Sequence, residues 1–442
     1  MSFNQETSFG LSGSEIKRRH LLLKALLVGL ATGLLASGFR VALAQCETTR
    51  IHWLEQASLG WRIAGALGFA ILGGGISVWL VRKFAPEAAG SGIPHLKSVV
   101  LGEKNLNWRR LLPVKFLAGI AGIGGGLALG REGPTIQMGG STGLAVAEFL
   151  RVPPGQGERK ALISAGAGAG LAAAFNAPLA GMIFVLEELQ GNFTPVIFIA
   201  AFLASVSADI VGRVLTGELP VFHLRDMAAP TLSTLPLAAV LGLVVGFSGI
   251  IFNRGLLLGL DLFERAKRWP PFITGALAGL CLGAAACFTP VVSGSGGLLA
   301  EQALRGEIAV RWLPLFIILR FFLTMVSYGS GAAGGIFAPL LVLGALGGLL
   351  VGNLGNMLAP TAIPHPEIFA VLGMGALFTS TVRAPLTGIV LMVELTGQYS
   401  FMLPLLTACL IAYGVAEWRQ CLPIYEALRL RSQSVSTHSA GN

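Results

Sequence analysis

Two glutamates in strongly apolar surroundings are the residues of this sequence best placed to do chemistry. Glu132 lies inside the glycine-rich turn Gly130-Arg131-Glu132-Gly133-Pro134, and Glu188 follows Glu187 after an apolar run. A carboxylate inside a membrane costs about 2.5 to 3.5 kcal/mol, so one that is kept there is a functional candidate. Burial favours a protonated carboxyl and helix N-termini favour the ionised form, so the balance can bring proton binding into the biological pH range. The chemistry that fits is proton binding and release within a membrane.

Three glycine-rich turns indicate a second chemistry, which is anion binding. Each places a proline at or near the first turn of an expected helix, where the missing N–H costs nothing. A broken helix exposes unpaired N–H groups, and its dipole adds roughly half a positive charge at that end. Anions are therefore the natural ligand if these helix N-termini point inward. The turns are Gly90-Ser91-Gly92-Ile93-Pro94, Gly130 to Pro134 and Gly334 to Pro339.

The elements that must position these groups are membrane helices. Of the 442 residues, 54% are hydrophobic and 12% are charged, and the mean hydropathy is +0.73. Such a chain cannot cover itself with polar surface. The stretch from Phe321 to Pro366 contains no Asp, Glu, Lys or Arg, whereas one bilayer-spanning helix needs only about 20 apolar residues. Because glycine and proline cut several such stretches, we expect an all-α polytopic membrane protein with many tilted and broken helices and no soluble domain.

An internal duplication runs through the sequence. Residues 176–187 reappear as residues 383–394, 207 positions later, and the Gly130 turn aligns with Gly335 to Pro339 at an offset of 205. Duplicated membrane halves with interrupted helices form substrate sites at their interface near mid-membrane. The expected parts are an N-terminal segment 1–19, a first repeat 20–215, a connector 216–234, a second repeat 235–425 and a C-terminal tail 426–442.

The duplication also tests which carboxylates the scaffold requires. A carboxylate that both halves keep is open to a structural role, such as tying down a neighbouring backbone. One that faces an apolar residue in the other half is not required by the fold. The matched pairs are Glu187 with Glu394, Glu132 with Phe337, and Glu188 with Leu395. Glu132 and Glu188 are thus functional candidates, although a helix cap for Glu132 and a structural hydrogen bond for Glu188 stay open.

Charge and cysteine usage exclude several other classes. The net charge of +9 comes without a basic run long enough to follow nucleic acid. Lys17, Arg18, Arg19 and Lys24 instead indicate a cytoplasmic N-terminus. The segment from Lys17 to Gln45 also resembles a signal peptide, but its apolar core is long and interrupted by Lys24, so we expect a retained first helix. Five cysteines without a CxxC pair and six scattered histidines predict no metal site and no disulfide scaffold, and we expect no cofactor.

The three turns in order, the duplication and the late Tyr425 resemble the CLC family of chloride channels and chloride/proton exchangers over about residues 20 to 430. The resemblance implies a homodimer with one anion pathway per subunit and two inverted halves within each. It implies that Glu132 is the outer gate and proton acceptor and that Glu188 is the inner proton-transfer residue. The chloride ligands that it implies are Ser91, Gly92, Ile93, Ile336, Phe337 and Tyr425.

These assignments predict exchange of chloride for protons in a lipid bilayer, most naturally a prokaryotic plasma membrane. A passive voltage- or pH-gated chloride channel is the alternative, and Glu188 is the feature that separates the two. An intramembrane hydrolase built on Ser91 and His95 is a third reading. It lacks a third group to hold the base and any GxSxG or HExxH motif, so we expect no enzyme.

Simpler roles compete at several of these positions. Ser91 can cap a helix, Tyr425 can belong to an interfacial aromatic belt, and Phe337 can be ordinary core. Lys115 stands in an apolar context, where it can either raise the local positive potential or pair structurally. His95 stands where many family members carry glutamate, and its own titration could alter the response to pH.

Overall fold

Regular secondary structure is entirely helical in the residues that the computed structural model describes, which are 13–154, 157–217, 222, 230–266 and 268–440. This confirms the all-α prediction. Helices satisfy every backbone hydrogen bond within one segment, as the hydrocarbon region of a membrane requires. The first part of the chain contains α1 (Gly13–Gln56), α2 (Leu59–Phe84), α3 (Ile93–Val100), α4 (Trp108–Gly119), α5 (Glu132–Phe149), α6 (Gly157–Phe175), α7 (Pro178–Phe184) and α8 (Pro195–Thr216).

The second part of the chain continues the same kind of arrangement and ends in a helix that runs through the expected tail. Its helices are α9 (Leu235–Arg265), α10 (Pro271–Phe288), α11 (Gly297–Leu304), α12 (Leu313–Gly329), α13 (Phe337–Leu358), α14 (Ile368–Val382), α15 (Pro385–Thr396), α16 (Met402–Trp418) and α17 (Ile424–Ala440). Two π-helical turns, η2 (Ile120–Gly124) and η3 (Val185–Gln190), extend α4 and α7.

Element bounds differ from the expected parts at two places. Helix α1 begins at Gly13 and continues without a break past Ala44, so the basic residues near position 17 belong to it. Helix α17 begins at Ile424, so the expected boundary at residue 425 falls inside a helix. Most of the connector 216–234, the first 12 residues and the side chains of Lys17, Arg18 and Arg19 lie outside the described residues.

Eight helical segments in the described ranges are long and apolar enough to cross a membrane, and the chain is a multi-pass integral membrane protein. Several other helices are too short to do so alone. Helices α3, α7 and α11 have eight, seven and eight residues. Short helices of this kind end inside the molecule, where their N-termini can face a buried site.

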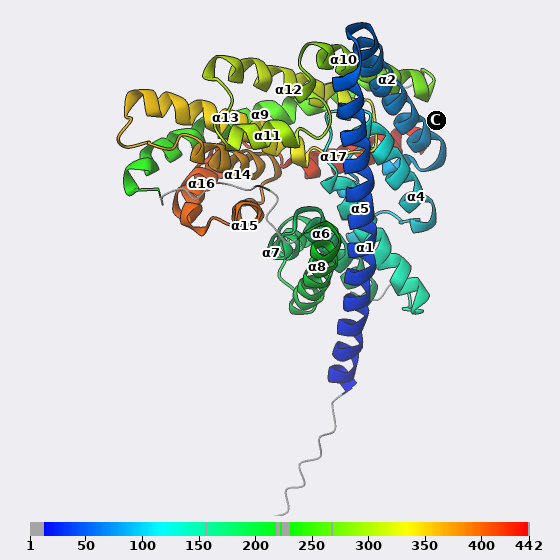
Figure 1. Cartoon of the computed structure of the whole chain (residues 1–442). Helices are drawn as coiled ribbons and strands as arrows, with labels where there is room; N and C mark the ends of the chain where they lie inside the picture. The colour runs from blue at the N-terminus through cyan, green and yellow to red at the C-terminus, as the bar shows by residue number, and fades with distance from the viewer. Residues whose placement is uncertain (1–12, 155–156, 218–221, 223–229, 267, 441–442) are drawn as a thin grey trace, which may run out of the picture.

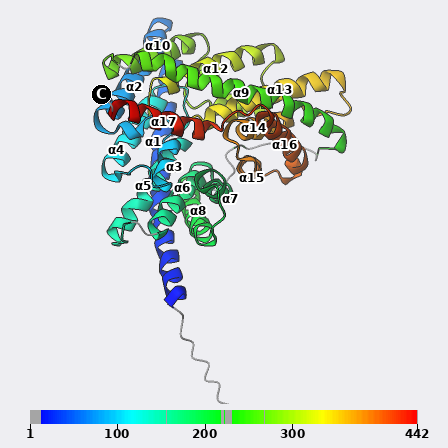
Figure 2. The same ribbon diagram turned by 180° about the vertical axis from the view of Figure 1, so that it is seen from behind.

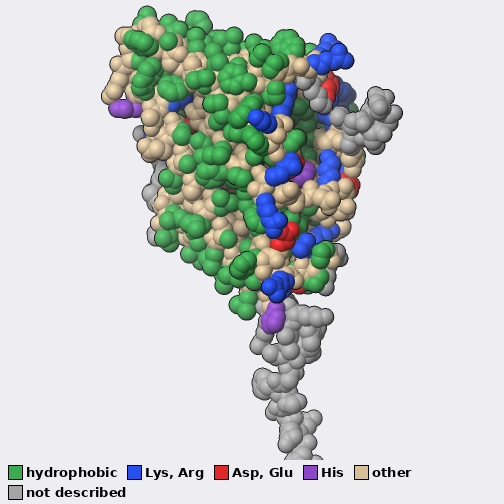
Figure 3. All heavy atoms as spheres, turned by 90° about the vertical axis from the view of Figure 1, so that its right-hand side faces the viewer, with side chains coloured by type: hydrophobic (Ala, Val, Ile, Leu, Met, Phe, Trp, Pro, Cys, Tyr) green, Lys and Arg blue, Asp and Glu red, His purple; other side chains and the backbone are tan. Residues whose placement is uncertain are grey.

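The two parts of the chain form two groups of helices that meet near α17. In Figure 1, α1 runs along one side, α6, α7 and α8 lie together below, and α9, α12, α13, α14 and α16 form the other group. Figure 2 shows α17 starting beside α14 and running across the helices of the first part, close to α3. Figure 3 shows apolar side chains over most of one face and a strip of Lys and Arg side chains.

Glycine allows paired helices to approach closely at corresponding places in the two parts. A Cβ on Gly139 of α5 would lie 2.1 Å from the carbonyl oxygen of Gly166 on α6. A Cβ on Gly344 of α13 would lie 2.4 Å from the carbonyl oxygen of Gly373 on α14. Without a hydrophobic force between helices in lipid, association depends on such close packing. This accounts for much of the glycine in the sequence.

A reciprocal contact joins the matched segments of the duplication. The Glu187 carboxylate accepts hydrogen bonds from the amides of Leu386 (3.1 Å) and Thr387 (2.8 Å) at the start of α15. The Glu394 carboxylate accepts them from the amides of Leu179 (3.0 Å) and Ala180 (2.7 Å) at the start of α7. Each glutamate thus caps the helix N-terminus of the other half. The structural role considered for Glu187 is the one that the geometry supports.

Candidate functional site

The helix N-termini of α5 and α13 meet at the centre of the molecule. Gly130 and Gly335 exchange two backbone hydrogen bonds, each 2.7 Å long. The turn before α3 joins them, because the Gly90 amide donates to Ala332 (3.0 Å) and the Gly90 carbonyl accepts from the Gly334 amide (3.1 Å). The three glycine-rich turns predicted from the sequence therefore form one backbone cluster. Helix N-termini that converge in this way make a positive, anion-attracting region.

Glu132 lies at this convergence, with 3% of its surface exposed. A Cβ on Gly130 would lie 2.3 Å from Glu132 Oε2 and 2.9 Å from the amide nitrogen of Ala338, so carboxylate and amide border the same glycine. Arg131 Nε is 3.9 Å from Oε1, whereas Oε2 has no hydrogen-bond partner among the described residues. The carboxylate of α5 thus sits at the N-terminus of α13.

The predicted chloride ligands are all buried, and all except Tyr425 belong to the three turns of this cluster. Ser91, Ile93, Ile336, Phe337 and Tyr425 have no exposed surface. A Cβ on Gly133 would lie 2.8 Å from Ser91 Cβ, so the serine turn abuts the start of α5. The sixth candidate, Gly92, caps α3 at a φ of 77°, a left-handed conformation that favours glycine.

The structure bears on the simpler roles considered for Ser91, Phe337 and Tyr425. The Ile93 amide lies 3.4 Å from Ser91 Oγ, which is a weak capping contact. The Phe337 ring packs against Phe175 and Phe378, with centroids 5.3 Å and 4.5 Å away. The Tyr425 hydroxyl is buried and has no hydrogen-bond partner in the described part of the chain. A buried hydroxyl without a partner is costly, which makes Tyr425 a candidate for contact with a bound species.

A cavity of about 770 Å³ reaches the backbone of Gly90 and Gly92. Its walls come from the α3 turn, the ends of α9 and α12, and α17. Basic side chains at its edge favour entry of an anion. The lining includes His95, Lys104, Tyr328, Leu428 and Arg431, together with the acidic Glu87 and Glu264.

Two buried cations hold the paired turns in place. Lys115 Nζ donates to the carbonyls of Ala88 (2.9 Å) and Gly90 (2.7 Å). Arg320, 205 positions later, donates to the carbonyls of Val292 (2.8 Å) and Gly294 (3.0 Å). Of the two roles left open for Lys115, the structure shows the structural one. Sequence reasoning missed Arg320, although its offset from Lys115 equals that of the glycine turns.

Glu188 is buried and is paired with a lysine of α3. Lys97 Nζ is 2.9 Å from Glu188 Oε1. Lys97 follows Ile93 by one helical turn on the short α3, so this helix contacts the central turns at one end and Glu188 further along. Sequence reasoning did not single out Lys97. The signal that could have pointed to such a lysine was the need of a buried carboxylate for a counter-ion.

The hydrolase alternative finds no support in the geometry. His95 Nδ1 lies 3.4 Å from Gln137 Nε2, and no hydrogen bond joins His95 to Ser91 among the described residues. The serine hydroxyl therefore has no base beside it.

Helix α17 carries Tyr425, and Arg429 of this helix forms ion pairs with Glu103 and Glu426 whose strength depends on pH. Hydrogen bonds from Arg429 hold the pKa values of Glu103 and Glu426 below their usual range. Because these pKa values are lower in the folded protein, the attachment is complete above the ordinary carboxyl range of roughly 4 and is lost as the pH falls below it. We expect the protection of the α17 amides, measured relative to intrinsic exchange at each pH, to fall in that acid range. The Arg429→Met variant should show low protection already at neutral pH, and high, pH-independent protection in both proteins would contradict this.

Comparisons with known proteins agree with this arrangement. The family profile described as "Voltage gated chloride channel" matches residues 73–417. The H(+)/Cl(-) exchange transporter ClcA of Vibrio cholerae serotype O1 is 41% identical over 420 residues, which cover 93% of this chain and 89% of the relative. The protein of the same name from Vibrio parahaemolyticus is 40% identical over 420 residues, covering 93% of this chain and 90% of the relative.

Solved structures show the same fold. The crystal structure of a slow cyanobacterial Cl−/H+ antiporter matches with a TM-score of 0.86 and 37% identity, covering 94% of this chain and 98% of that one. A CLC-type fluoride/proton antiporter matches with a TM-score of 0.78 over 92% of this chain and 97% of that one, but at 23% identity. The second likeness concerns the fold alone. Because the profile covers most of the chain and relatives align over nearly all of it, this chain belongs to the CLC family.

Proposed function

We propose that this protein exchanges chloride for protons across a membrane, with Glu132 as the group that links the two ions. The observation that carries the proposal is the Glu132 carboxylate at the N-terminus of α13, beside the Ala338 amide. A helix N-terminus favours any anion, so a carboxylate there takes the place that a chloride ion would otherwise occupy. Protonation removes the charge that holds it, and the side chain leaves the anion path.

The buried groups around the cluster supply the chloride cradle in this proposal. Ser91 and Tyr425 offer hydroxyls, and the backbone near Gly92, Ile336 and Phe337 offers N–H groups. The unpartnered Tyr425 hydroxyl supports this, because chloride would be its missing acceptor. The cavity that reaches Gly90 and Gly92 gives anions an approach to the serine turn.

Glu188 provides the inner proton path in the proposal. It is buried, with 5% of its side chain exposed, and it pairs with Lys97 one helical turn along α3 from Ile93. A proton taken up there would reach Glu132 by a route separate from the chloride cradle. The relatives reported above are named as exchangers, which supports exchange over a passive channel.

We further propose a homodimer with one anion pathway per subunit, in the inner membrane of a bacterium. The ClcA relatives come from bacteria. Exposed large apolar side chains on the membrane-spanning helices provide the surface for lipid and for a second subunit. A second subunit is not needed to complete the site, because the groups named for it all come from one chain.

Reconstitution in lipid vesicles tests the exchange. We expect an outward chloride gradient to drive protons inward against their own gradient, because both ions use Glu132 in turn. Simultaneous recording of chloride with an electrode and of external pH measures both fluxes. Vesicles in which chloride moves and protons do not follow would contradict exchange. A zero-current voltage at the chloride equilibrium potential, unaffected by a pH gradient, would instead identify the passive channel.

A further inference from the structure

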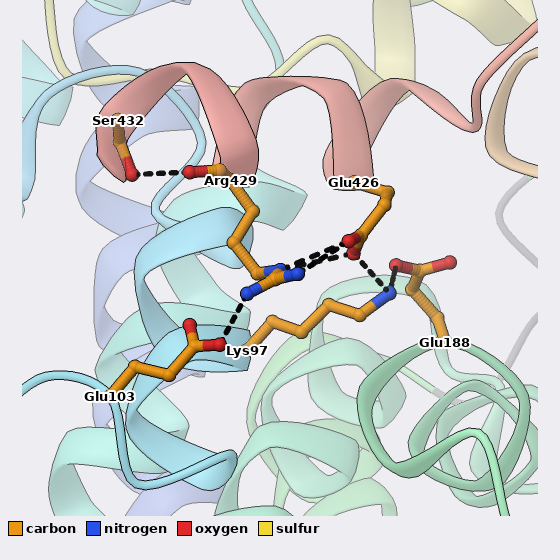
Figure 4. A network of polar contacts seen from close by, with 6 residues as sticks. All are labelled: Lys97, Glu103, Glu188, Glu426, Arg429 and Ser432. Atoms are coloured by element: carbon orange, nitrogen blue, oxygen red, sulfur yellow. Dashed lines mark hydrogen bonds and ion pairs between the residues drawn. The ribbon is translucent and has the colours of Figure 1, made fainter. Parts of the chain in front are cut away.

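Glu188 belongs to a network of five charged side chains (Figure 4). Lys97 of α3 lies 2.9 Å from Glu188 Oε1 and 3.5 Å from Glu426 Oε2. On α17, Arg429 Nη2 is 2.6 Å from Glu426 Oε1, and Arg429 also contacts Glu103. One lysine is therefore shared between two carboxylates that come from different parts of the chain.

The exposed fraction of the side chain increases from Glu188 through Lys97 to Glu426. The side chain of Glu188 is 5% exposed, that of Lys97 is 18% exposed and that of Glu426 is 26% exposed. Lys97 thus stands between a buried carboxylate and one that water can reach. This gradient of exposure gives a proton a route from solution toward Glu188 that passes the ammonium group.

The two carboxylates depend on Lys97 to different degrees. Glu426 has Arg429 as a second cation, whereas Lys97 is the one cation within ion-pair distance of Glu188 in the described ranges. Figure 4 shows the other Glu188 oxygen pointing away from the network. A buried ionised carboxylate without a partner is strongly unfavourable. The ionised state of Glu188 therefore rests on Lys97.

Other groups near Glu188 do not replace Lys97. Glu187 carries a negative charge beside it, but its carboxylate is directed to the amides of α15. Tyr425 approaches from α17 and is neutral. From α6, the polar contact to the same π-helical turn is the Ser164 hydroxyl, which accepts from Gln190 at 2.6 Å. Lys97 is the cation that these elements direct at the site.

We propose that Lys97 is a positioning residue for proton transfer at Glu188. Its ammonium group stabilises the deprotonated Glu188 carboxylate and turns toward Glu426 once Glu188 is protonated. The inference rests on the exchange function proposed above. The step is balanced: a proton from the inner solution forms an O–H bond on Glu188, and Lys97 keeps its own proton. The three carboxylates and two cations of the network then change from a net charge of −1 to zero.

The geometry of Lys97 allows this exchange of partners. An ammonium group has three donors on a flexible stem, so it can bond both carboxylates at once and shift between them. Lys97 Nζ lies 2.9 Å from Glu188 Oε1 and 3.5 Å from Glu426 Oε2. A small rotation of the lysine stem is therefore enough to exchange the two partners. Glu426 stays ionised throughout because Arg429 remains bound to it.

The test compares wild type, Lys97→Met and Lys97→Arg in vesicles while the internal pH is varied. Without the ammonium, the protonated Glu188 is favoured. The internal pH at half-maximal proton flux should therefore rise by about 1 to 3 pH units, the usual effect of an opposite charge at this distance. Lys97→Arg keeps the charge and should stay close to the wild-type midpoint. The control is Lys24→Met, which removes another lysine–glutamate pair, with Glu158 at 2.6 Å, far from Glu188 in the sequence.

A wild-type pH profile in Lys97→Met would overturn the inference while leaving exchange intact. Absence of uphill proton flux in the wild type would reject exchange and the inference together, so the two failures are distinguishable. Infrared titration of the carboxyl C=O band, assigned by its loss in Glu188→Gln, gives a readout that needs no transport. If Lys97→Met does not fold, Lys97→Gln takes its place in both measurements. An unshifted band would also overturn the inference.

Discussion

Replacement of Glu132 by glutamine is expected to abolish proton coupling and leave chloride flux in place. The amide matches the carboxyl in size but cannot bind or release a proton. It also carries no charge to hold it at the N-terminus of α13, so it neither blocks the anion path by charge nor carries protons. Chloride-driven proton flux should fall by about 100-fold or more, because a positioned proton-transfer group contributes at least that much to a rate. Chloride flux should lose its dependence on pH.

Paired recordings of chloride and proton flux in vesicles measure this result. Glu301→Gln is the matched control, since Glu301 is 40% exposed and its partner is Arg305 on the same helix surface. That variant should couple like the wild type. Uphill proton flux at the wild-type rate in Glu132→Gln would remove Glu132 from the mechanism, and loss of both fluxes would assign it to structure.

Glu188→Gln is expected to stop proton transport while chloride still passes. The glutamine oxygen can still accept a hydrogen bond from Lys97, so the packing of η3 against α3 is kept. The titratable group on the inner side is nevertheless gone. Because this variant keeps the Glu132 carboxyl group, its gating by external protons should remain, and chloride flux should keep its dependence on external pH. Proton flux should again fall by about 100-fold or more.

The contrast between the two variants is the sharper test, because only Glu132→Gln should remove the external pH dependence of chloride flux. Glu158→Gln provides the control, since Glu158 likewise accepts from a lysine, Lys24, at 2.6 Å. Its transport should match the wild type. If Glu188→Gln still moved protons uphill at the wild-type rate, the inner proton path would have to run elsewhere.

Much of the fold could be predicted from local features of the sequence. The apolar stretches and their interruption by glycine and proline predicted broken membrane helices, because such breaks act on the backbone within a few residues. The duplication predicted that the turns near Gly130 and Gly335 correspond, and the structure pairs them directly. The same comparison singled out Glu132 as a carboxylate that the fold does not require, and it lies at that pairing.

Local features of the sequence could not predict the ion pairs between distant segments. Lys97 and Glu188 are 91 positions apart, and Glu103 and Arg429 are 326 apart. Nothing in the neighbourhood of Lys97 distinguishes it from a lysine at the end of a helix. Arg320 is a different case, because its 205-residue offset from Lys115 was a signal in the sequence, while its carbonyl partners 26 and 28 positions away come within reach only once the chain has turned back.

By itself, the sequence determined that the chain enters a membrane, where its helices break and which carboxylates the duplicated scaffold could have done without. Hydropathy, glycine and proline act on the backbone within a few residues, so their consequences can be predicted from the local sequence. Only the tertiary structure decided which charges face one another: Glu132 against the N-terminus of α13, Glu188 against Lys97, and Lys115 and Arg320 against the turns. Electrostatic energy depends on distance in space, and in a low-dielectric interior that distance is set by how the helices pack.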